Sequence, residues 1–301
     1  YTDINQLPPS HSLSISLDGE LILKKYWDID PNKRTSLSKD DSVEYFKELF
    51  NTSIRRRMRS DVEVGTSFSG GLDSSAVVAS ISHLFPNNSL NTFTARFKDD
   101  NYDEGKYIDC VKQKYKFNSH FTWPTSELLI NELDKVFYHQ EEPFGSASVF
   151  VQWDVYRTAS SNIKVILDGQ GADEILGGYL PFYKDYLNQL FWWNKTLYKK
   201  ELRAYNSLRN IKINSLKKDE NIRMKLGRYK RKISRKDFSY KNNNLKHELY
   251  KSTMCGNLQD LLRYSDRNSM ANSIEVRLPF LCHKLVEFCF TLPDNFLLNQ
   301  G

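Results

Sequence analysis

The stretch "TSFSGGLDSSAVVA" at residues 66–79 places serines, glycines and an aspartate between two apolar segments. The preceding "VEVGTSF" alternates and is rich in β-branched residues, as strands are, and "SSAVVASISHLF" has apolar residues at helical spacing. The residues from Ser69 to Ser74 are therefore predicted to form a turn from a strand into a helix. The first N–H groups of that helix have no partner within it and, together with the helix dipole, favour an anion.

This turn contains the residue types that phosphate binding requires. Gly70 and Gly71 carry no Cβ, so the backbone can approach an anion closely. Ser69 and Ser74 can donate hydroxyl hydrogen bonds, and Asp73 can hold a magnesium ion beside the phosphates. The common P-loop pattern requires a lysine after the glycines, and none follows here. The alternative is an ordinary glycine–serine turn that caps a helix.

A second glycine-rich turn follows another apolar segment. "IKVILD" is predicted to be a buried strand, and it runs directly into "GQGADEILGGY" at residues 169–179. Gly169 and Gly171 permit close approach, and Asp173 and Glu174 supply oxygen ligands. A turn with Asp173 as a helix cap would explain this segment alone. Two glycine–carboxylate turns at one edge of a sheet make a magnesium–nucleotide site the simpler interpretation.

The elements that would position these turns alternate between strand and helix along the chain. This alternation predicts an α/β fold with a doubly wound parallel sheet, in which ligands bind outside the carboxyl ends of the strands. Ser69 and Asp168 both fall at such ends. A helix is also expected through "VEYFKELFNTSIRRRM", with Asp40 or Ser42 as its cap.

Composition limits the class of protein. The 301 residues are 40% hydrophobic and 27% charged, as in globular proteins, and no apolar run approaches the roughly 20 residues of a membrane span. The N-terminus lacks signal-peptide features, and the four cysteines show no C-x-x-C spacing, so a cytoplasmic protein without zinc or disulfides is expected. The net charge of +6 reflects basic residues at 195–246, interpreted as a helical insertion rather than a nucleic-acid site.

A third segment, "LLRYSDRNSMANSIEVRLPFLCHKLVEF" at residues 261–288, combines a helix bearing Arg263 and Arg267 with the pair Glu275 and Arg277. An ion-pair network between helices is one explanation for these charges. The three segments in this order, however, resemble the C-terminal synthetase domain of the glutamine-hydrolysing asparagine synthetases, members of the ATP pyrophosphatase (PP-loop) superfamily. The resemblance runs from about Leu7 to the end of the chain and is weakest in the basic insertion.

The resemblance implies a fold of the adenine nucleotide alpha hydrolase type with helical additions, and an ATP-dependent amide-forming ligase. Such an enzyme adenylates a carboxylate, here most simply the aspartate side chain, and ammonia then attacks to give asparagine and AMP. ATP and Mg²⁺ are the implied cofactors. Alternatives are a paralogue that amidates or cyclises another carboxylate (β-lactam, lasso peptide or sugar acid), a tRNA-modifying ATP pyrophosphatase, which shares only "SGGLDS", and a non-catalytic nucleotide-binding protein. Nucleic-acid and membrane partners are not expected, and a homodimer is a candidate assembly.

The resemblance also implies roles for individual residues. Magnesium would be held by Asp73 and Asp173, and catalysis would involve Gln170 and Glu275. ATP or pyrophosphate would be bound by Phe68, Ser69, Gly70, Gly71, Asp73, Ser74, Ala95, Asp168 and Gly169.

The sequence departs from the family pattern at three positions. Gln170 stands in place of a glutamate, Asp168 in place of a serine and Cys282 in place of an aspartate. A neutral amide at residue 170 can form hydrogen bonds but carries no charge, which leaves the carboxylate substrate open. Glu141 and Glu142 match substrate-facing positions only loosely.

The expected domain organisation follows from the same comparison. Residues 1–35, with a hairpin turn at Asp18 and Gly19, resemble the tail of a preceding glutaminase domain and a linker, and residues 36–301 resemble the synthetase domain with the insertion at 195–246. Neither the N-terminal nucleophilic cysteine nor the later lysine-bearing segment of the family can be assigned. The 301 residues are therefore expected to hydrolyse no glutamine and to make amide from free ammonia weakly or not at all, with the glutaminase domain as a partner in the full-length chain.

Overall fold

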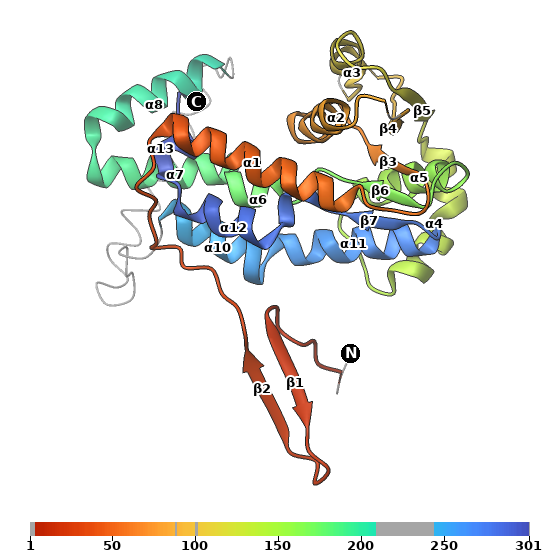
Figure 1. Cartoon of the computed structure of the whole chain (residues 1–301), viewed down its shortest axis with the longest axis horizontal. Helices are drawn as coiled ribbons and strands as arrows, with labels where there is room; N and C mark the ends of the chain where they lie inside the picture. The colour runs from red at the N-terminus through yellow and green to blue at the C-terminus, as the bar shows by residue number, and fades with distance from the viewer. Residues whose placement is uncertain (1–3, 88, 100–101, 209–243, 301) are drawn as a thin grey trace. The chain divides into compact units, whose positions relative to one another are not determined.

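The computed structural model describes residues 4–87, 89–99, 102–208 and 244–300 (Figure 1). The chain divides into two compact units. The first, called the sheet unit, comprises Leu37–Ala172 and Thr253–Cys289. The second, called the hairpin unit, comprises the described residues of Tyr1–Ser36, Asp173–Ser252 and Phe290–Gly301. Both units are discontinuous in sequence, and they describe compactness rather than domain boundaries along the chain. The predicted domains, residues 1–35 and 36–301, therefore stay a prediction.

The sheet unit contains a five-stranded, fully parallel sheet with the order β5-β4-β3-β6-β7. This confirms the predicted α/β fold. The chain passes from β3 to β4 and β5 on one side and then crosses to β6 and β7 on the other. The direction of winding therefore reverses between β3 and β6, and open α/β sheets bind ligands at such a switch point. The strands are β3 (Val64–Ser67), β4 (Asn91–Ala95), β5 (Asn118–Thr122), β6 (Val165–Leu167) and β7 (Glu275–Arg277).

Helices flank this sheet. α2 packs beside β3 and α1, whereas α5 packs across β4 and β5 and contacts α11. Tyr156 and Ala159 of α5 join Phe93 of β4 and Ile166 of β6 in a fully buried apolar cluster. The sheet-unit helices include α1 (Lys39–Arg57), α2 (Leu72–Leu84), α3 (Gly105–Lys112), α4 (Ser126–Gln140), α5 (Ser148–Ser160), α11 (Asn257–Ala271) and the 3₁₀ turn η1 (Pro279–Leu281).

The start of α1 differs from the sequence prediction. Neither Asp40 nor Ser42 caps this helix; Ser38 does, because its backbone is extended and its Oγ accepts the N–H of Asp41 at 3.2 Å. Asp40 instead lies in the first turn, where its negative charge favours the positive end of the helix dipole.

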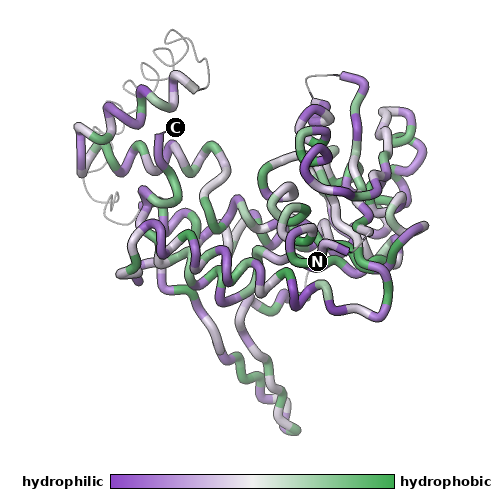
Figure 2. The backbone as a smooth tube through the Cα atoms, turned by 45° about the horizontal axis from the view of Figure 1, so that its top comes forward, coloured by the Kyte–Doolittle hydropathy of each residue, from purple (hydrophilic) through white to green (hydrophobic). Residues whose placement is uncertain are grey.

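The hairpin unit contains an antiparallel pair of strands, β1 (His11–Ile15) and β2 (Leu21–Lys25). Their turn includes Gly19 with φ of +83°, which agrees with the predicted turn at Asp18 and Gly19. Ile15 and Leu17 near the tip are exposed hydrophobic residues. Figure 2 shows hydrophobic positions along this hairpin. The remaining helices, three of which cross the unit boundary, are α6 (Ala172–Leu176), α7 (Leu180–Trp193), α8 (Lys195–Leu208), α10 (Leu245–Cys255), α12 (His283–Thr291) and α13 (Asp294–Leu297).

The predicted basic insertion is only partly visible. α8 forms its first part, but residues 209–243, which include "RYKRKISRK", lie outside the described residues. Within the described ranges, the helices are too short or too polar to cross a lipid bilayer.

Candidate functional site

The turn after β3 has the predicted strand–turn–helix geometry. Phe68 is buried and anchored to β4, since its N–H donates to the carbonyl of Phe93 at 2.9 Å and Thr94 Oγ1 donates to its carbonyl. Gly70 has φ of +90°, a conformation that favours glycine. α2 then begins with Gly71 as its N-cap, a residue with no side chain to accept the first N–H groups of the helix.

Two serines stabilise this turn from within. Ser69 Oγ accepts the N–H of Gly71 at 3.1 Å and lies 3.1 Å from Ser74 Oγ. Ser74 Oγ in turn donates to the Gly71 carbonyl at 3.2 Å. The hydroxyl groups predicted to meet phosphate therefore also hold the shape of the turn.

The turn after β6 is organised around Asp168. Its Oδ1 accepts the backbone N–H of Gln170 at 2.9 Å, and its own N–H donates to the Arg277 carbonyl of β7 at 3.0 Å. Gly171 has φ of +95°, and a Cβ there would clash with the side chain of Leu281. The turn is therefore tightly packed, and Gly171 is required by both its backbone and its surroundings.

The two turns touch each other through Gly169. A Cβ on Gly169 would lie 3.0 Å from the backbone nitrogen of Ser74 and 3.1 Å from the carbonyl carbon of Asp73. Only glycine permits this approach without displacement of the helix start. The structure therefore brings the Asp168–Gly169 turn against the first turn of α2 at the switch point of the sheet.

Asp168 lies in a polar but uncharged setting. Its Oδ2 accepts Ser67 Oγ at 2.8 Å and the Tyr156 hydroxyl at 3.3 Å. Burial raises the pKa of Asp168, although these hydrogen bonds oppose the shift. Among the described residues, no lysine, arginine or histidine forms an ion pair with it. Sequence reasoning missed Tyr156, because on α5 it looks like any other core aromatic residue at helical spacing.

The other predicted site residues are placed as follows. Ala95 ends β4 at the same edge of the sheet. Oε1 of Gln170 is buried and accepts no hydrogen bond from the described residues. Glu275 does not lie with the two turns. It is the first residue of β7, at the amino ends of the strands, whereas the turns follow the carboxyl ends. Its side chain is largely exposed and accepts a hydrogen bond from Arg277 Nε at 2.7 Å. Its catalytic role stays a prediction.

The two predicted magnesium ligands belong to different units. Asp73 is in the sheet unit and Asp173 opens a segment of the hairpin unit. Asp173 is half-buried, and burial raises the pKa of its carboxyl group. Within the described ranges, no group of three or more His, Cys, Asp or Glu side chains could hold a metal ion. A magnesium ion bound to phosphates needs only one or two protein carboxylates, so the donor set of the turn is compatible with it.

The arginines of α11 form ion pairs with the residues that follow α4. Arg263 Nη1 lies 3.3 Å from Glu142 Oε2, and Arg267 Nη2 lies 2.7 Å from Glu141 Oε2. Glu141 adopts φ of +59°, an uncommon conformation for a non-glycine residue. These two ion pairs connect α11 to the residues that follow α4, while the ion-pair network between helices considered for Asp266 and Arg267 stays a prediction. Whether Glu141 and Glu142 also face substrate stays a prediction.

Most of the chain matches a known protein family. The sequence model described as "Asparagine synthase" matches residues 45–301. This match includes both glycine turns, β7 and α11.

Individual relatives give the same picture. The chain is 29% identical to "Asparagine synthetase (glutamine-hydrolyzing) 3" of Bacillus subtilis strain 168, over 100% of this chain and 50% of that protein. It is 34% identical to "Putative asparagine synthetase (glutamine-hydrolyzing) 2" of Methanocaldococcus jannaschii, over 62% of this chain and 36% of that protein. It is also 24% identical to "Amidase chry2" of Gibberella zeae, over 63% of this chain and 31% of that protein. The chain spans 40% to 51% of the length of three Bacillus subtilis relatives, asparagine synthetases 1, 2 and 3.

Proposed function

The chain belongs to the asparagine synthase family, and from that premise we propose that it is the synthetase part of an ATP-dependent amide-forming ligase. In the proposed reaction a substrate carboxylate attacks the α-phosphorus of ATP, which releases pyrophosphate and leaves an acyl-adenylate. Ammonia then displaces AMP from the acyl carbon and loses a proton, and an amide results. The side chain of aspartate is the proposed carboxylate. The observation that carries this proposal is the contact of Gly169 with the start of α2 at the switch point of the sheet.

The turn after β3 is the proposed binding site for the phosphates. The start of α2 offers backbone N–H groups and the positive end of a helix dipole, and Gly70 and Gly71 let an anion approach. The adenylate is proposed to lie against Phe68, Ala95 and the backbone of residues 168–169. Because the turn is held by its own hydrogen bonds, little reorganisation is needed on binding, which favours electrostatic stabilisation of the departing pyrophosphate.

Magnesium is the proposed metal cofactor, with Asp73 and Asp173 as its protein ligands. When bound it would neutralise the negative charge of the phosphates. This part of the proposal rests on the sequence resemblance and on the position of Asp73 in the first turn of α2.

Gln170 is the proposed residue beside the reacting carboxylate. Its buried Oε1 lacks a hydrogen-bond donor among the described residues, and such a group costs free energy unless something pairs with it. A substrate N–H or O–H group would supply that partner. The neutral side chain and the similarity to an amidase-named protein keep a second substrate class open, in which another carboxylate is amidated or cyclised.

The proposed setting is the cytoplasm, with ammonia supplied by the glutaminase portion of a longer chain. The Bacillus subtilis relatives named glutamine-hydrolysing asparagine synthetases 1 and 3 are about twice as long as this chain, which supports that source. A homodimer stays a prediction, as does the absence of specific nucleic-acid binding by the insertion.

Carboxylate-dependent exchange of labelled pyrophosphate into ATP tests this function, because it requires only the adenylation half-reaction. We expect exchange with aspartate that is abolished in Asp73→Ala and in Asp173→Ala, while the circular dichroism spectrum is unchanged. Asp61→Ala, which alters an exposed aspartate before β3, is the matched control and should exchange like wild type.

Two results would contradict the proposal. One is undiminished exchange in Asp73→Ala. The other is wild-type protein that binds MgATP but exchanges no pyrophosphate with any member of a panel of amino acids, sugar acids and peptide carboxylates.

A further inference from the structure

The buried hydroxyl of Tyr156 connects two parts of the sheet unit that are far apart in sequence. Tyr156 is 0% exposed, and its hydroxyl lies 3.3 Å from Asp168 Oδ2 and 3.0 Å from Ser265 Oγ on α11. A phenol has one hydrogen to donate, and the carboxylate accepts it. Ser265, itself buried, must then donate its hydrogen to the Tyr156 oxygen. The hydrogen bonds therefore run in one direction, from Ser265 through Tyr156 to Asp168.

Asp168 passes this constraint on to the turn that contains Gln170. Its second oxygen, Oδ1, accepts the Gln170 N–H, and Ser67 Oγ shares Oδ2 with Tyr156. The carboxylate is thus held from three directions: by the end of β3, by α5 and by its own turn. Loss of one donor would leave the carboxylate less restrained and its orientation less defined.

We propose that Tyr156 is a positioning residue of the ligase, which fixes the orientation of Asp168 and through it the turn at 168–171. This inference rests on the proposed function for its catalytic consequence, but not for its structural one. Tyr156 touches neither the Ser69–Ser74 turn nor the start of α2 through any hydrogen bond of its hydroxyl. Its effect therefore falls first on the turn that carries Gln170, and it reaches the proposed phosphate site only indirectly, through the contact of Gly169 with the start of α2.

The burial of the hydroxyl supports this assignment over simple core packing. The ring fills the apolar cluster with Phe93 and Ile166, a role that phenylalanine would serve equally well. Burial raises the pKa of Tyr156 well above its ordinary value, so the hydroxyl keeps its proton and remains a donor at all physiological pH values. A buried polar atom is costly unless its hydrogen bonds are made, and both partners here lie within reach.

The test compares Tyr156→Phe with Tyr264→Phe, a partly buried tyrosine on α11 that packs on the neighbouring apolar cluster. In pyrophosphate exchange, Tyr156→Phe should lower kcat about tenfold while the KM for ATP changes less than about twofold, since small misplacements near the reacting groups are costly to rate. Ser265→Ala should act in the same direction with a smaller effect, because the tyrosine remains in place. Tyr264→Phe should resemble wild type.

Hydrogen–deuterium exchange of the ligand-free protein gives a second readout that is independent of catalysis. The backbone amides of residues 168–171 should exchange faster in Tyr156→Phe and in Ser265→Ala than in Tyr264→Phe. If wild type shows no pyrophosphate exchange, the proposed function fails, but the amide exchange still decides the positioning role. Unchanged amide exchange in both test variants would overturn the inference. So would a fall in kcat that Tyr264→Phe reproduces.

Discussion

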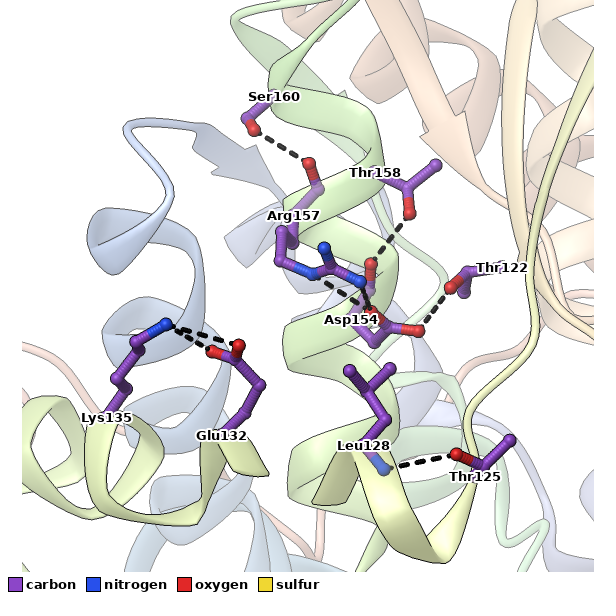
Figure 3. Close-up of polar contacts among 9 residues, drawn as sticks. All are labelled: Thr122, Thr125, Leu128, Glu132, Lys135, Asp154, Arg157, Thr158 and Ser160. Atoms are coloured by element: carbon purple, nitrogen blue, oxygen red, sulfur yellow. Dashed lines mark hydrogen bonds and ion pairs between the residues drawn. The ribbon is translucent and has the colours of Figure 1, made fainter. Parts of the chain in front are cut away.

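Two carboxylates in the sheet unit, the buried Asp154 and the partly buried Asp168, each accept a hydrogen bond from the hydroxyl of the last residue of a strand, yet their remaining partners differ. Asp154 on α5 accepts Thr122 Oγ1 at the end of β5, and Asp168 accepts Ser67 Oγ at the end of β3. Asp154 also binds Arg157, with Nε at 3.1 Å and Nη2 at 2.5 Å (Figure 3). Asp168 instead has Tyr156 and the Gln170 N–H.

This difference indicates that Asp154 stabilises the fold, whereas Asp168 orients a turn of the candidate functional site. Arg157 neutralises Asp154, so that cluster can join α5 to β5 with no further partner. The uncharged donors around Asp168 orient its carboxylate but do not neutralise it. Asp168 belongs to one of the two glycine turns. There the orientation of the carboxylate, and with it the backbone conformation of residues 168–171, matters more than a contribution to the stability of the fold.

Removal of the cation should have the largest effect. Arg157→Met leaves Asp154, whose side chain is 0% exposed, without its ion-pair partner. We expect a loss of about 2 to 3 kcal/mol in the free energy of unfolding, below the usual range for a buried pair because Arg157 is half-exposed. Urea denaturation measures this loss. Lys135→Met breaks the exposed Glu132–Lys135 pair in Figure 3 and should change stability by less than about 0.5 kcal/mol, and an equal loss in both variants would remove the distinction.

A smaller effect is expected at Asp103, a second carboxylate with a guanidinium partner. Arg96 binds both of its oxygens, at 2.7 and 2.8 Å, and these hydrogen bonds lower the pKa of Asp103 to about 2. The folded pKa is therefore below the unfolded value of 3.8. The resulting stability is present above pH 3.8 and is lost as the pH falls toward 2.

Asp103→Asn should consequently destabilise the protein by about 1 to 2 kcal/mol at pH 7, the scale of a charge-assisted hydrogen bond. The difference from wild type should shrink as the pH is lowered. Urea midpoints at pH 7 and pH 3 measure both quantities. A difference that is constant with pH would show that the charge of Asp103 has no part in the interaction.

Asp168 should show the opposite sign and the smallest effect. Its folded pKa is raised by burial, so its ionisation opposes folding, and wild type should lose stability relative to Asp168→Asn as the pH rises from 3.8 through the folded pKa. Asparagine can still accept the Gln170 N–H and donate to the two hydroxyls. The stability of both proteins from pH 3 to pH 8 tests this. A relative gain for wild type with rising pH would mean that an unrecognised cation stabilises Asp168.

The sequence was informative where a local pattern carries the structure. β6 is apolar and β3 lies in an alternating segment rich in β-branched residues, and glycines follow each strand. The alternation of strands and helices predicted the parallel sheet, but the position of its switch point was not predicted. β5 and β7 were not foreseen, since "NSHFT" is polar and β7 has only three residues. Both become strands because a neighbouring strand offers its backbone groups for pairing.

Contacts between distant residues set the limit of prediction at the site. The motifs predicted that the turns at 69–74 and 168–171 lie at one edge, but not that Gly169 packs against Ser74. The roles of Tyr156, Ser265 and Asp154 depend on which helix face meets which strand end. Asp168 was expected beside the adenylate. Only the three-dimensional structure shows that its carboxylate accepts hydrogen bonds from Ser67, Tyr156 and the N–H of Gln170.

The central claim is that the two glycine turns together bind a nucleotide. Hydrogen–deuterium exchange of wild type with and without MgATP tests it most directly, because it requires no turnover and no knowledge of the carboxylate. The account predicts slower exchange of backbone amides in residues 66–75 and in residues 164–171, with little change along the basic helix α8. Protection of α8 alone, or none in either turn at saturating MgATP, would contradict it.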